Sequence, residues 1–192
     1  MADGAYKRFI DSMVMDFDKW HDGIGFDLSA LKEMSPDDLK TIVTVLLGRD
    51  QTWREIEALA AIGDERARQS VRKSADDPES PDNRLVAMEE LHRAGEMPDI
   101  EQRLCREIRK LAGDGAGLTK ALLMAQRYPT DQVKQALLWS TWNSTTASLH
   151  CAATLLYLCG VAKDQLGFEH RPLLFDLTPN NNHFTRQAAF DK

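Results

Sequence analysis

The sequence predicts an all-α protein made of stacked helical hairpins. Apolar residues recur with the period of amphipathic helices, helix start and stop residues alternate along the chain, and no two segments resemble a pair of strands. The chain has 192 residues, of which 43% are hydrophobic and 28% charged. This composition is typical of a globular domain with a sizeable core.

The first element is a predicted amphipathic helix that ends near His21-Asp22-Gly23. Its apolar positions follow the i, i+3, i+4, i+7 rule, which places them on one helix face. These positions are Tyr6, Phe9, Ile10, Met13, Val14 and Phe17. The segment Gly25-Phe26-Asp27-Leu28 is then predicted as a connector.

The second helix has a clear start and a clear end. Ser35 is a favourable N-cap, Pro36 suits the first helical position, and Gly48 follows the last apolar residue. The β-branched run from Thr41 to Val45 would also suit a strand, but the start and stop residues favour a helix.

The remaining chain is expected to form helices separated by short breaks. Those breaks are Gly63, Asp76–Asp82, Gly95–Pro98, Gly113–Gly117, Tyr128–Thr130, Gly160–Gly167 and Thr178–Asn182. A faint repeat supports this regular alternation of helices and breaks. The Leu-x-x-x-Gly segment Leu59–Gly63 recurs as Leu91–Gly95 and as Leu156–Gly160, each time at the end of the first helix of a pair. A helix-pair period of about 30–40 residues indicates an α-solenoid.

Two segments carry a resemblance to a known repeat family. Residues 57–67, an Ala/Leu-rich helix followed by Gly63-Asp64 and a second helix, resemble the short HEAT-like repeat, and residues 83–91 resemble the next first helix. The resemblance implies a right-handed α-α superhelix of HEAT-like hairpins that serves as a protein-binding scaffold. It implies one domain over 1–192, with capping helices in 1–50, HEAT-like pairs in 51–177 and a C-terminal helix in 178–192. The loop Asp76–Asp82 is longer than the family pattern, and the later pairs are degenerate.

No residue set forms a complete catalytic, cofactor or metal site. The glycine-rich segment at 113–117 lacks a preceding strand and a Gly-Lys-Ser/Thr end, and Glu89-x-x-His92 occurs only once, whereas di-iron bundles need two such pairs. Asp16, Asp18 and Asp22 lack the central glycine and terminal glutamate of a calcium loop. We therefore predict no catalysis, no cofactor and no bound metal.

Cysteine and histidine give no nucleophile pair. His150 and Cys151 are adjacent, so on a helix their side chains point about 100° apart. The three cysteines, Cys105, Cys151 and Cys159, stand among apolar neighbours and are expected to be small core residues. Their odd number, the absence of a secretory signal at residues 1–4 and the shortness of every apolar run predict a cytoplasmic protein outside the membrane.

Charge is unevenly distributed, and this predicts the nature of the partner. The chain carries −6, with −4 in residues 1–50, −3 in 51–112 and +1 in 113–192. An acidic N-terminal part favours a basic protein partner and disfavours nucleic acid. The predicted partner-binding acids are Asp16, Asp18, Asp22 and Asp27 near the N-terminus and Asp76, Asp77, Glu79 and Asp82 in the long loop.

Two further sets of residues have more than one interpretation. Arginines and lysines on two predicted second helices could bind phosphate or an acidic partner, but we favour their pairing with nearby acids and with the helix dipole. The first row is Arg66, Arg68, Arg72 and Lys73, and the second is Arg103, Arg106, Arg109 and Lys110. Trp142 is either a binding hot spot or the plug of a repeat junction, with Trp139 in the core, and the sequence leaves both open.

A small, acidic, HEAT-like chain without chemistry is similar to an immunity protein, which neutralises a bacterial toxin by direct binding. That similarity implies a basic toxin domain as the partner. Two alternatives remain: a HEAT-like nucleic-acid-binding protein, as in the HEAT-like DNA glycosylases, that uses Arg68, Arg72, Arg106 and Arg109, and a cofactor-handling or lyase-associated HEAT-like protein.

Overall fold

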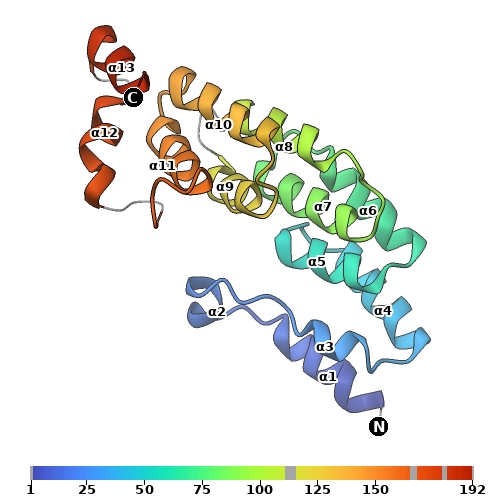
Figure 1. Cartoon of the computed structure of the whole chain (residues 1–192). Coiled ribbons are helices and arrows are strands. Elements are labelled where there is room, and N and C mark those ends of the chain that lie inside the picture. The colour runs from blue at the N-terminus through green and yellow to red at the C-terminus, as the bar shows by residue number, and fades with distance from the viewer. Residues whose placement is uncertain (1, 111–115, 165–167, 179–180, 192) are drawn as a thin grey trace. The chain divides into compact units, whose positions relative to one another are not determined.

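The computed structural model describes residues 2–110, 116–164, 168–178 and 181–191. It confirms the all-α class, because 70% of it is helical and no strand occurs in those residues (Figure 1). The chain forms two compact units, unit 1 (Met1–Met97) and unit 2 (Pro98–Lys192). Three of the expected breaks fall partly on residues 111–115, 165–167 and 179–180, outside the described part of the chain.

Most helices of unit 1 begin at a side chain that accepts a hydrogen bond from the first turn. These N-cap residues are Asp16, Asp27, Ser35, Thr52 and Asp64. The predicted start at Ser35-Pro36 and the predicted end at Gly48 are both confirmed. The helices are α1 Ala2–Ser12, α2 Phe17–His21, α3 Leu28–Leu31, α4 Pro36–Leu47, α5 Trp53–Ile62, α6 Glu65–Ala75 and α7 Pro81–Arg93.

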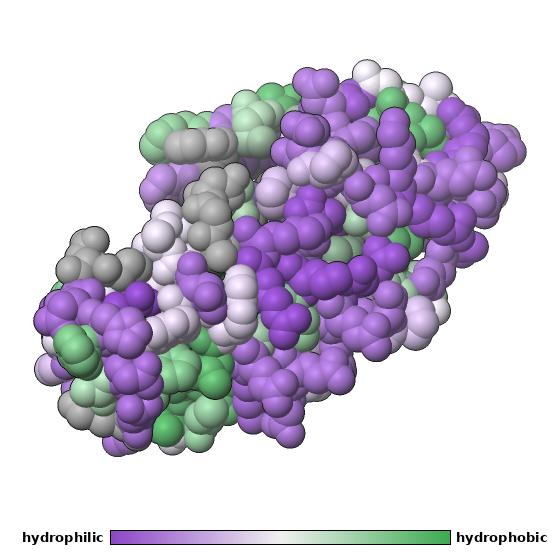
Figure 2. Space-filling model, turned by 90° about the horizontal axis from the view of Figure 1, so that it is seen from above, coloured by the Kyte–Doolittle hydropathy of each residue, from purple (hydrophilic) through white to green (hydrophobic). Residues whose placement is uncertain are grey.

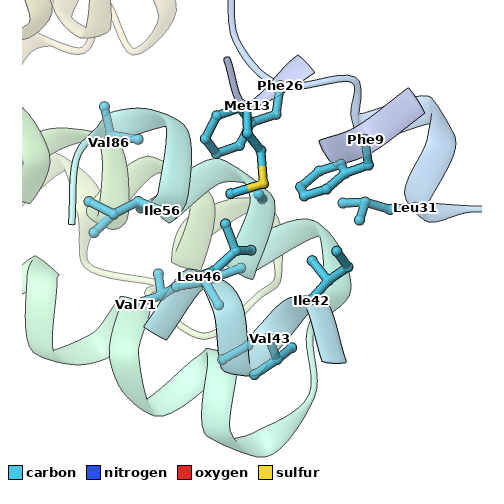
Figure 3. Packing of buried hydrophobic residues seen from close by; sticks show 14 of the residues in the cluster. Phe9, Met13, Phe26, Leu31, Ile42, Val43, Leu46, Ile56, Val71 and Val86 are labelled. Carbon is cyan, nitrogen blue, oxygen red and sulfur yellow. The ribbon is translucent and has the colours of Figure 1, made fainter. Parts of the chain in front are cut away.

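The core of unit 1 lies where α5, α6 and α7 pack on one another and where α1 and α3 join them at the N-terminal end (Figure 1). Figure 3 shows Phe9 of α1 and Met13, which follows α1, directed toward Leu46 and its neighbours on α4. The Phe9 and Phe26 rings meet edge to face, with centroids 5.6 Å apart. Burying such side chains is the main favourable term in folding.

The prediction of one continuous helix from Tyr6 to His21 is wrong. α1 ends at Ser12, and α2 begins only at Phe17. In a continuous helix the Ser12 carbonyl would accept from the residue four positions later, but here it accepts from Arg54 Nη2 at 2.9 Å. Asp16 meanwhile accepts from the Lys19 N–H at 2.8 Å and starts a new helix.

Unit 2 is built around α10, which packs against both α8 and α11. Buried hydroxyls stabilise these contacts. Ser140 Oγ of α10 donates to the Ile108 carbonyl of α8 at 3.0 Å, and Ser148 Oγ of α11 donates to the Thr141 carbonyl of α10 at 2.6 Å. A small cluster that includes Ala153 and Leu174 joins α11 to α12 and α13. The elements are α8 Ile100–Lys110, α9 Leu118–Arg127, α10 Asp131–Asn143, α11 Ser148–Leu158, the 3-10 turn Phe168–His170, α12 Arg171–Asp176 and α13 His183–Phe190.

The repeated glycines end helices, as the sequence predicts. Gly63, Gly95 and Gly160 have φ values of 67°, 76° and 71°. This left-handed conformation favours glycine, because a Cβ would strain the backbone there. Among the described residues, no helix combines the length and the apolar composition that a membrane crossing requires.

Candidate functional site

The sharp break between α1 and α2 creates an exposed segment that we call the N-terminal tip, residues 14–24. Its apolar side chains lie outside the core: Val14 is 64% exposed, Met15 50%, Phe17 71% and Ile24 47%. Exposed carboxylates, those of Asp16, Asp18 and Asp22, are interleaved with them. An exposed apolar patch of this kind marks an interaction site more often than scattered single residues do.

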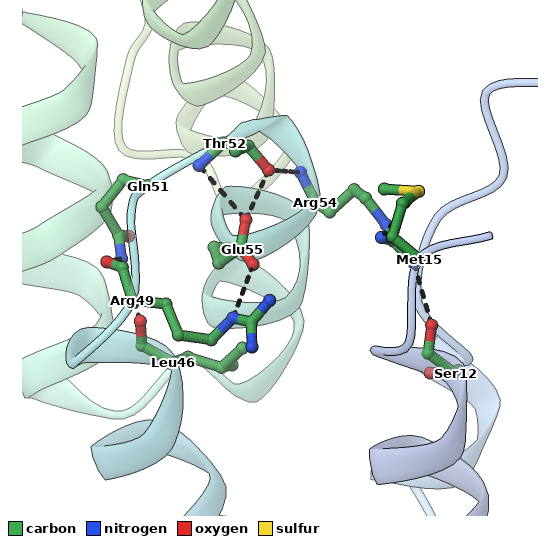
Figure 4. A network of polar contacts seen from close by, with 8 residues as sticks. All are labelled: Ser12, Met15, Leu46, Arg49, Gln51, Thr52, Arg54 and Glu55. Atoms are coloured by element: carbon green, nitrogen blue, oxygen red, sulfur yellow. Dashed lines mark hydrogen bonds and ion pairs between the residues drawn. The ribbon is translucent and has the colours of Figure 1, made fainter. Parts of the chain in front are cut away.

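A buried arginine holds the tip in place (Figure 4). Arg54 of α5 is only 4% exposed, and its guanidinium lies over the Phe26 ring at 4.3 Å from the centroid. It donates to the Ser12 carbonyl through Nη2 and contacts Met15 Sδ at 3.7 Å through Nη1. Burial lowers the Arg54 pKa, but an arginine stays charged at any physiological pH. Arg54 therefore anchors the tip to α5, while the side chains of Val14 and Phe17 face solvent.

The neighbouring Glu55 is fixed by a separate set of contacts (Figure 4). Its carboxylate is nearly buried and lies 3.2 Å from Arg49 Nε. It also accepts from the Thr52 N–H, while the Thr52 side chain accepts from the Glu55 N–H, and these two bonds form a capping box. The Glu55 carboxylate thus compensates the charge of Arg49 within unit 1.

The four predicted N-terminal acids have two kinds of environment. Asp16, Asp18 and Asp22 are exposed, whereas Asp27 is half-buried as the N-cap of α3. The Lys19 N–H lowers the pKa of Asp16, and the Ser29 hydroxyl lowers the pKa of Asp27. Asp16 and Asp27 thus both cap helices, but Asp16 is exposed like Asp18 and Asp22, whereas Asp27 is half-buried.

The second predicted acidic segment forms one wall of an open groove in unit 1. Asp76 ends α6, and Asp77 is half-buried because its carboxylate accepts from the Glu79 N–H at 2.9 Å. Asp76, Glu79 and Asp82 are exposed. The groove has a volume of about 960 Å³ and is lined by Leu47, Gln51, Gln69, Ser70, Lys73, Ser74, Asp76, Asp77 and Pro78.

The two arginine rows differ. On α6, Arg72 contacts Glu96 at 2.7 Å and Glu65 at 3.3 Å, and Arg68 lies 3.6 Å from Glu96. The interpretation that these cations pair with nearby acids is confirmed for Arg68 and Arg72 on α6 and for Arg103 with Asp99 and Lys110 with Glu107 on α8; the sequence does not indicate Glu96 as a partner. On α8, Arg106 and Arg109 are exposed and make no ion pair with another described residue.

The two tryptophans have different environments. Trp139 is 43% exposed, so its predicted core position is wrong. Trp142 is half-buried against α13: its ring meets Phe190 at 5.2 Å, and the Arg186 guanidinium lies 4.7 Å from the ring centroid. Arg186 also donates to the Trp142 carbonyl at 2.8 Å. The use of Trp142 as a binding hot spot stays a prediction.

The residues considered for chemistry have different environments. Burial raises the pKa of Cys151 to about 12, so its thiol is protonated at neutral pH. Cys105 is buried as expected, but Cys159 is exposed, which corrects its predicted core position. His92 donates through Nδ1 to the Met97 carbonyl at 2.8 Å, and Glu89 is buried 3.5 Å from Arg93. In the described part of the chain, no three His, Cys, Asp or Glu residues gather closely enough to hold a metal ion.

Sequence reasoning missed the exposed apolar residues of the tip and the anchoring role of Arg54. Val14 and Phe17 fit the helical period, which predicts that they lie on a buried face. The signal against that assignment is Asp16 between them, because aspartate favours an N-cap over a helix interior. Nothing in the sequence indicates that Arg54 is buried or that it donates to the carbonyl of Ser12, which lies 42 positions earlier in the chain.

Comparison of the chain with protein-family models, with curated proteins and with solved structures finds no match.

Proposed function

We propose that the chain is a protein-binding module of HEAT-like helical hairpins, wound as a right-handed superhelix, whose partner is a basic protein. The observation that carries this proposal is the charge of unit 1. Residues 1–97 hold 13 Lys and Arg against 21 Asp and Glu, a formal charge of −8, whereas residues 98–192 hold 11 against 9, a charge of +2.

The position of the charges supports the proposal as much as their number. Cations of unit 1 such as Arg72 and Arg49 are held by acids of the same unit. Six of the eight predicted acids, in contrast, present exposed side chains. A surface with a net negative charge speeds the association of a basic partner and selects against acidic ones.

Within this class, we propose an immunity protein or inhibitor that neutralises a basic toxin domain by direct binding. Such an inhibitor needs rapid association and a surface complementary to its target, and it needs no chemistry of its own. A genome gives a direct test: co-expression of this chain with a toxin reading frame that neighbours its gene should restore growth, and expression of the toxin alone should arrest it.

One observation favours a second candidate. Arg106 and Arg109 of α8 lie three positions apart, exposed and without an ion pair to a described residue. This pair suits a phosphate or a carboxylate, so an acidic partner or a nucleic acid would bind unit 2. The charge of −8 on unit 1 opposes this candidate, because it repels any polyanion that approaches closely.

Isothermal titration calorimetry, in which two variants of the chain are titrated with the identified partner, distinguishes the two candidates. The first variant combines Asp76→Asn, Glu79→Gln and Asp82→Asn, and the second combines Arg72→Gln, Arg106→Gln and Arg109→Gln. Exposed charge pairs contribute about 0.2–1 kcal/mol each, so we expect the first variant to bind about three- to a hundredfold more weakly and the second to bind about as tightly as the unmodified chain. The opposite order would favour the acidic partner.

A further inference from the structure

We propose that the N-terminal tip is the docking site for a basic amphipathic segment of the partner, in which one large apolar side chain is flanked by lysines or arginines. The inference rests on the proposed function and names the surface and the chemistry of the bound segment. The juxtaposition that supports it is an exposed apolar patch, an apolar groove at its edge and three outward carboxylates.

The apolar part of the tip has no role in the core of its own unit. Val14, Met15, Phe17 and Ile24 are each about half exposed or more, and they fall within a single short segment. Figure 2 shows another view of the protein surface, in which hydrophobic areas interrupt a largely hydrophilic face. Exposed apolar side chains cost little when they are scattered, but a contiguous group favours burial against another surface.

An apolar groove adjoins this patch and is bordered by the same Val14 side chain. It has a volume of about 330 Å³ and is lined by Ile10, Met13, Val14, Val45 and Arg49. Arg49 is paired with Glu55 at 3.2 Å, so the groove has no uncompensated cation at its edge. A groove of this size suits one large apolar side chain, and such anchors dominate the binding energy of protein interfaces.

The charges around the patch specify a cationic segment. Residues 14–24 carry three aspartates against one lysine, a formal charge of −2. Lys19 is turned back onto its own chain, where Nζ donates to the Val14 carbonyl at 2.8 Å and lies 3.5 Å from Asp16. The outward field of the tip is therefore negative, which favours cationic side chains and disfavours an acidic segment.

The backbone of the tip is fixed before any partner arrives. Arg54 ties the Ser12 carbonyl to α5, Asp16 caps α2, and the Ile24 N–H donates to the Lys19 carbonyl at 2.9 Å. Binding to a segment that is already ordered avoids much of the entropy cost of fixing a mobile loop. The tip thus combines an apolar anchor site, a complementary charge and preorganisation.

Two synthetic helical peptides test the inference on the full chain by fluorescence anisotropy. Both carry the same number of lysines, and one has leucines on the opposite face where the other has serines. We expect the chain to bind the Leu/Lys peptide at least about tenfold more tightly than the Ser/Lys peptide, because only the former offers an apolar anchor.

Variants then assign this binding to the tip. The double variant Val14→Ser with Phe17→Ser should lower the affinity for the Leu/Lys peptide about tenfold or more, and Asp18→Asn with Asp22→Asn should weaken it and reduce its dependence on salt. Phe184→Ser is the matched control, because this aromatic side chain in unit 2 is 85% exposed, and it should leave binding unchanged. All of these positions are exposed, and circular dichroism confirms that each variant folds.

The outcomes separate this inference from the proposed function. If the tip variant binds the Leu/Lys peptide and the identified partner as the unmodified chain does, while the loop variant of Asp76, Glu79 and Asp82 loses the partner, the proposed function stands and the tip inference fails. If neither variant affects a basic partner, both fail. A concentration-dependent dimer in sedimentation that Phe17→Ser abolishes would instead show that the tip binds a second copy of the chain and would overturn the inference.

Discussion

The two units differ in how their helices begin and in their net charge. In unit 1, five helices begin at a side chain that accepts a hydrogen bond from the first turn. In unit 2, Asn182 of α13 does so, whereas the N-caps of α9, α10, α11 and α12 make no such bond. Unit 1 carries −8 and unit 2 carries +2. Acidic residues therefore serve unit 1 twice, as helix caps and as surface charge.

The rows of arginines on α6 and α8 sharpen this difference. Each row has two members in the last turn of its helix, where cations are favourable for the helix dipole. Glu96 lies 2.7 Å from Arg72, but no described acid contacts Arg106 or Arg109. Glu96 and Glu65 thus occupy Arg72, whereas Arg106 and Arg109 have no described acid in contact with them.

The largest expected effect concerns the core of unit 1. Leu59 is fully buried in the cluster that joins α1, α4, α5 and α6. Leu59→Ala should lower the free energy of unfolding by about 2–5 kcal/mol. Hydrogen exchange followed by mass spectrometry should show the loss of protection mainly in residues 2–97, and Leu137→Ala, at a fully buried position on α10, should show it mainly in unit 2. Equal loss over both units in both variants would contradict the division.

A smaller effect separates the two kinds of helix start. Thr52 forms a capping box with Glu55, whereas Thr130 at the start of α10 makes no side-chain cap bond, and its buried hydroxyl has no hydrogen-bond partner among the described residues. Thr52→Ala should cost about 0.5–2 kcal/mol of stability, and Thr130→Ala less than about 0.5 kcal/mol. Urea denaturation measures both. Similar losses would mean that the caps do not distinguish the units.

The sequence predicts the helices well where local chemistry decides. Ser35, Gly48 and Gly63 each act through their immediate neighbours, so their roles can be read from a short window. At the break after Ser12 only the new start at Asp16 has such a local signal, because the donor to the Ser12 carbonyl is Arg54 on another helix. Tertiary contacts override the periodic pattern at that point.

The candidate site was predictable only as a set of charges. The sequence identifies the exposed aspartates Asp16 and Asp18, but it places Val14 and Phe17 in the core and treats Asp27 as equivalent to the other acids. Exposure depends on which helix face meets another element, and that follows from packing. The interaction of charged rows with distant acids such as Glu96 is equally invisible, since it joins residues more than twenty positions apart.

The smallest expected effect is a dependence on pH that arises from one cap of unit 1. Hydrogen bonds, first that from the Ser29 hydroxyl, hold the pKa of Asp27 below its usual value. The unfolded chain therefore binds the proton more tightly, so this contribution to stability is present at neutral pH and is lost as the pH falls below about 4. Asp27→Asn keeps an oxygen that can cap α3 but removes the charge. Because Asp27 is partly exposed and 3.8 Å from Arg8, we expect a loss of only a few tenths of a kcal/mol at pH 7 and almost none at pH 3. Asn182→Asp in unit 2 should do the reverse, since it places a charge at the N-cap of α13. Urea midpoints at the two pH values measure both changes. A difference for Asp27→Asn that persists at pH 3 would assign the role of Asp27 to packing, and charge would then not distinguish its cap from the neutral cap of unit 2.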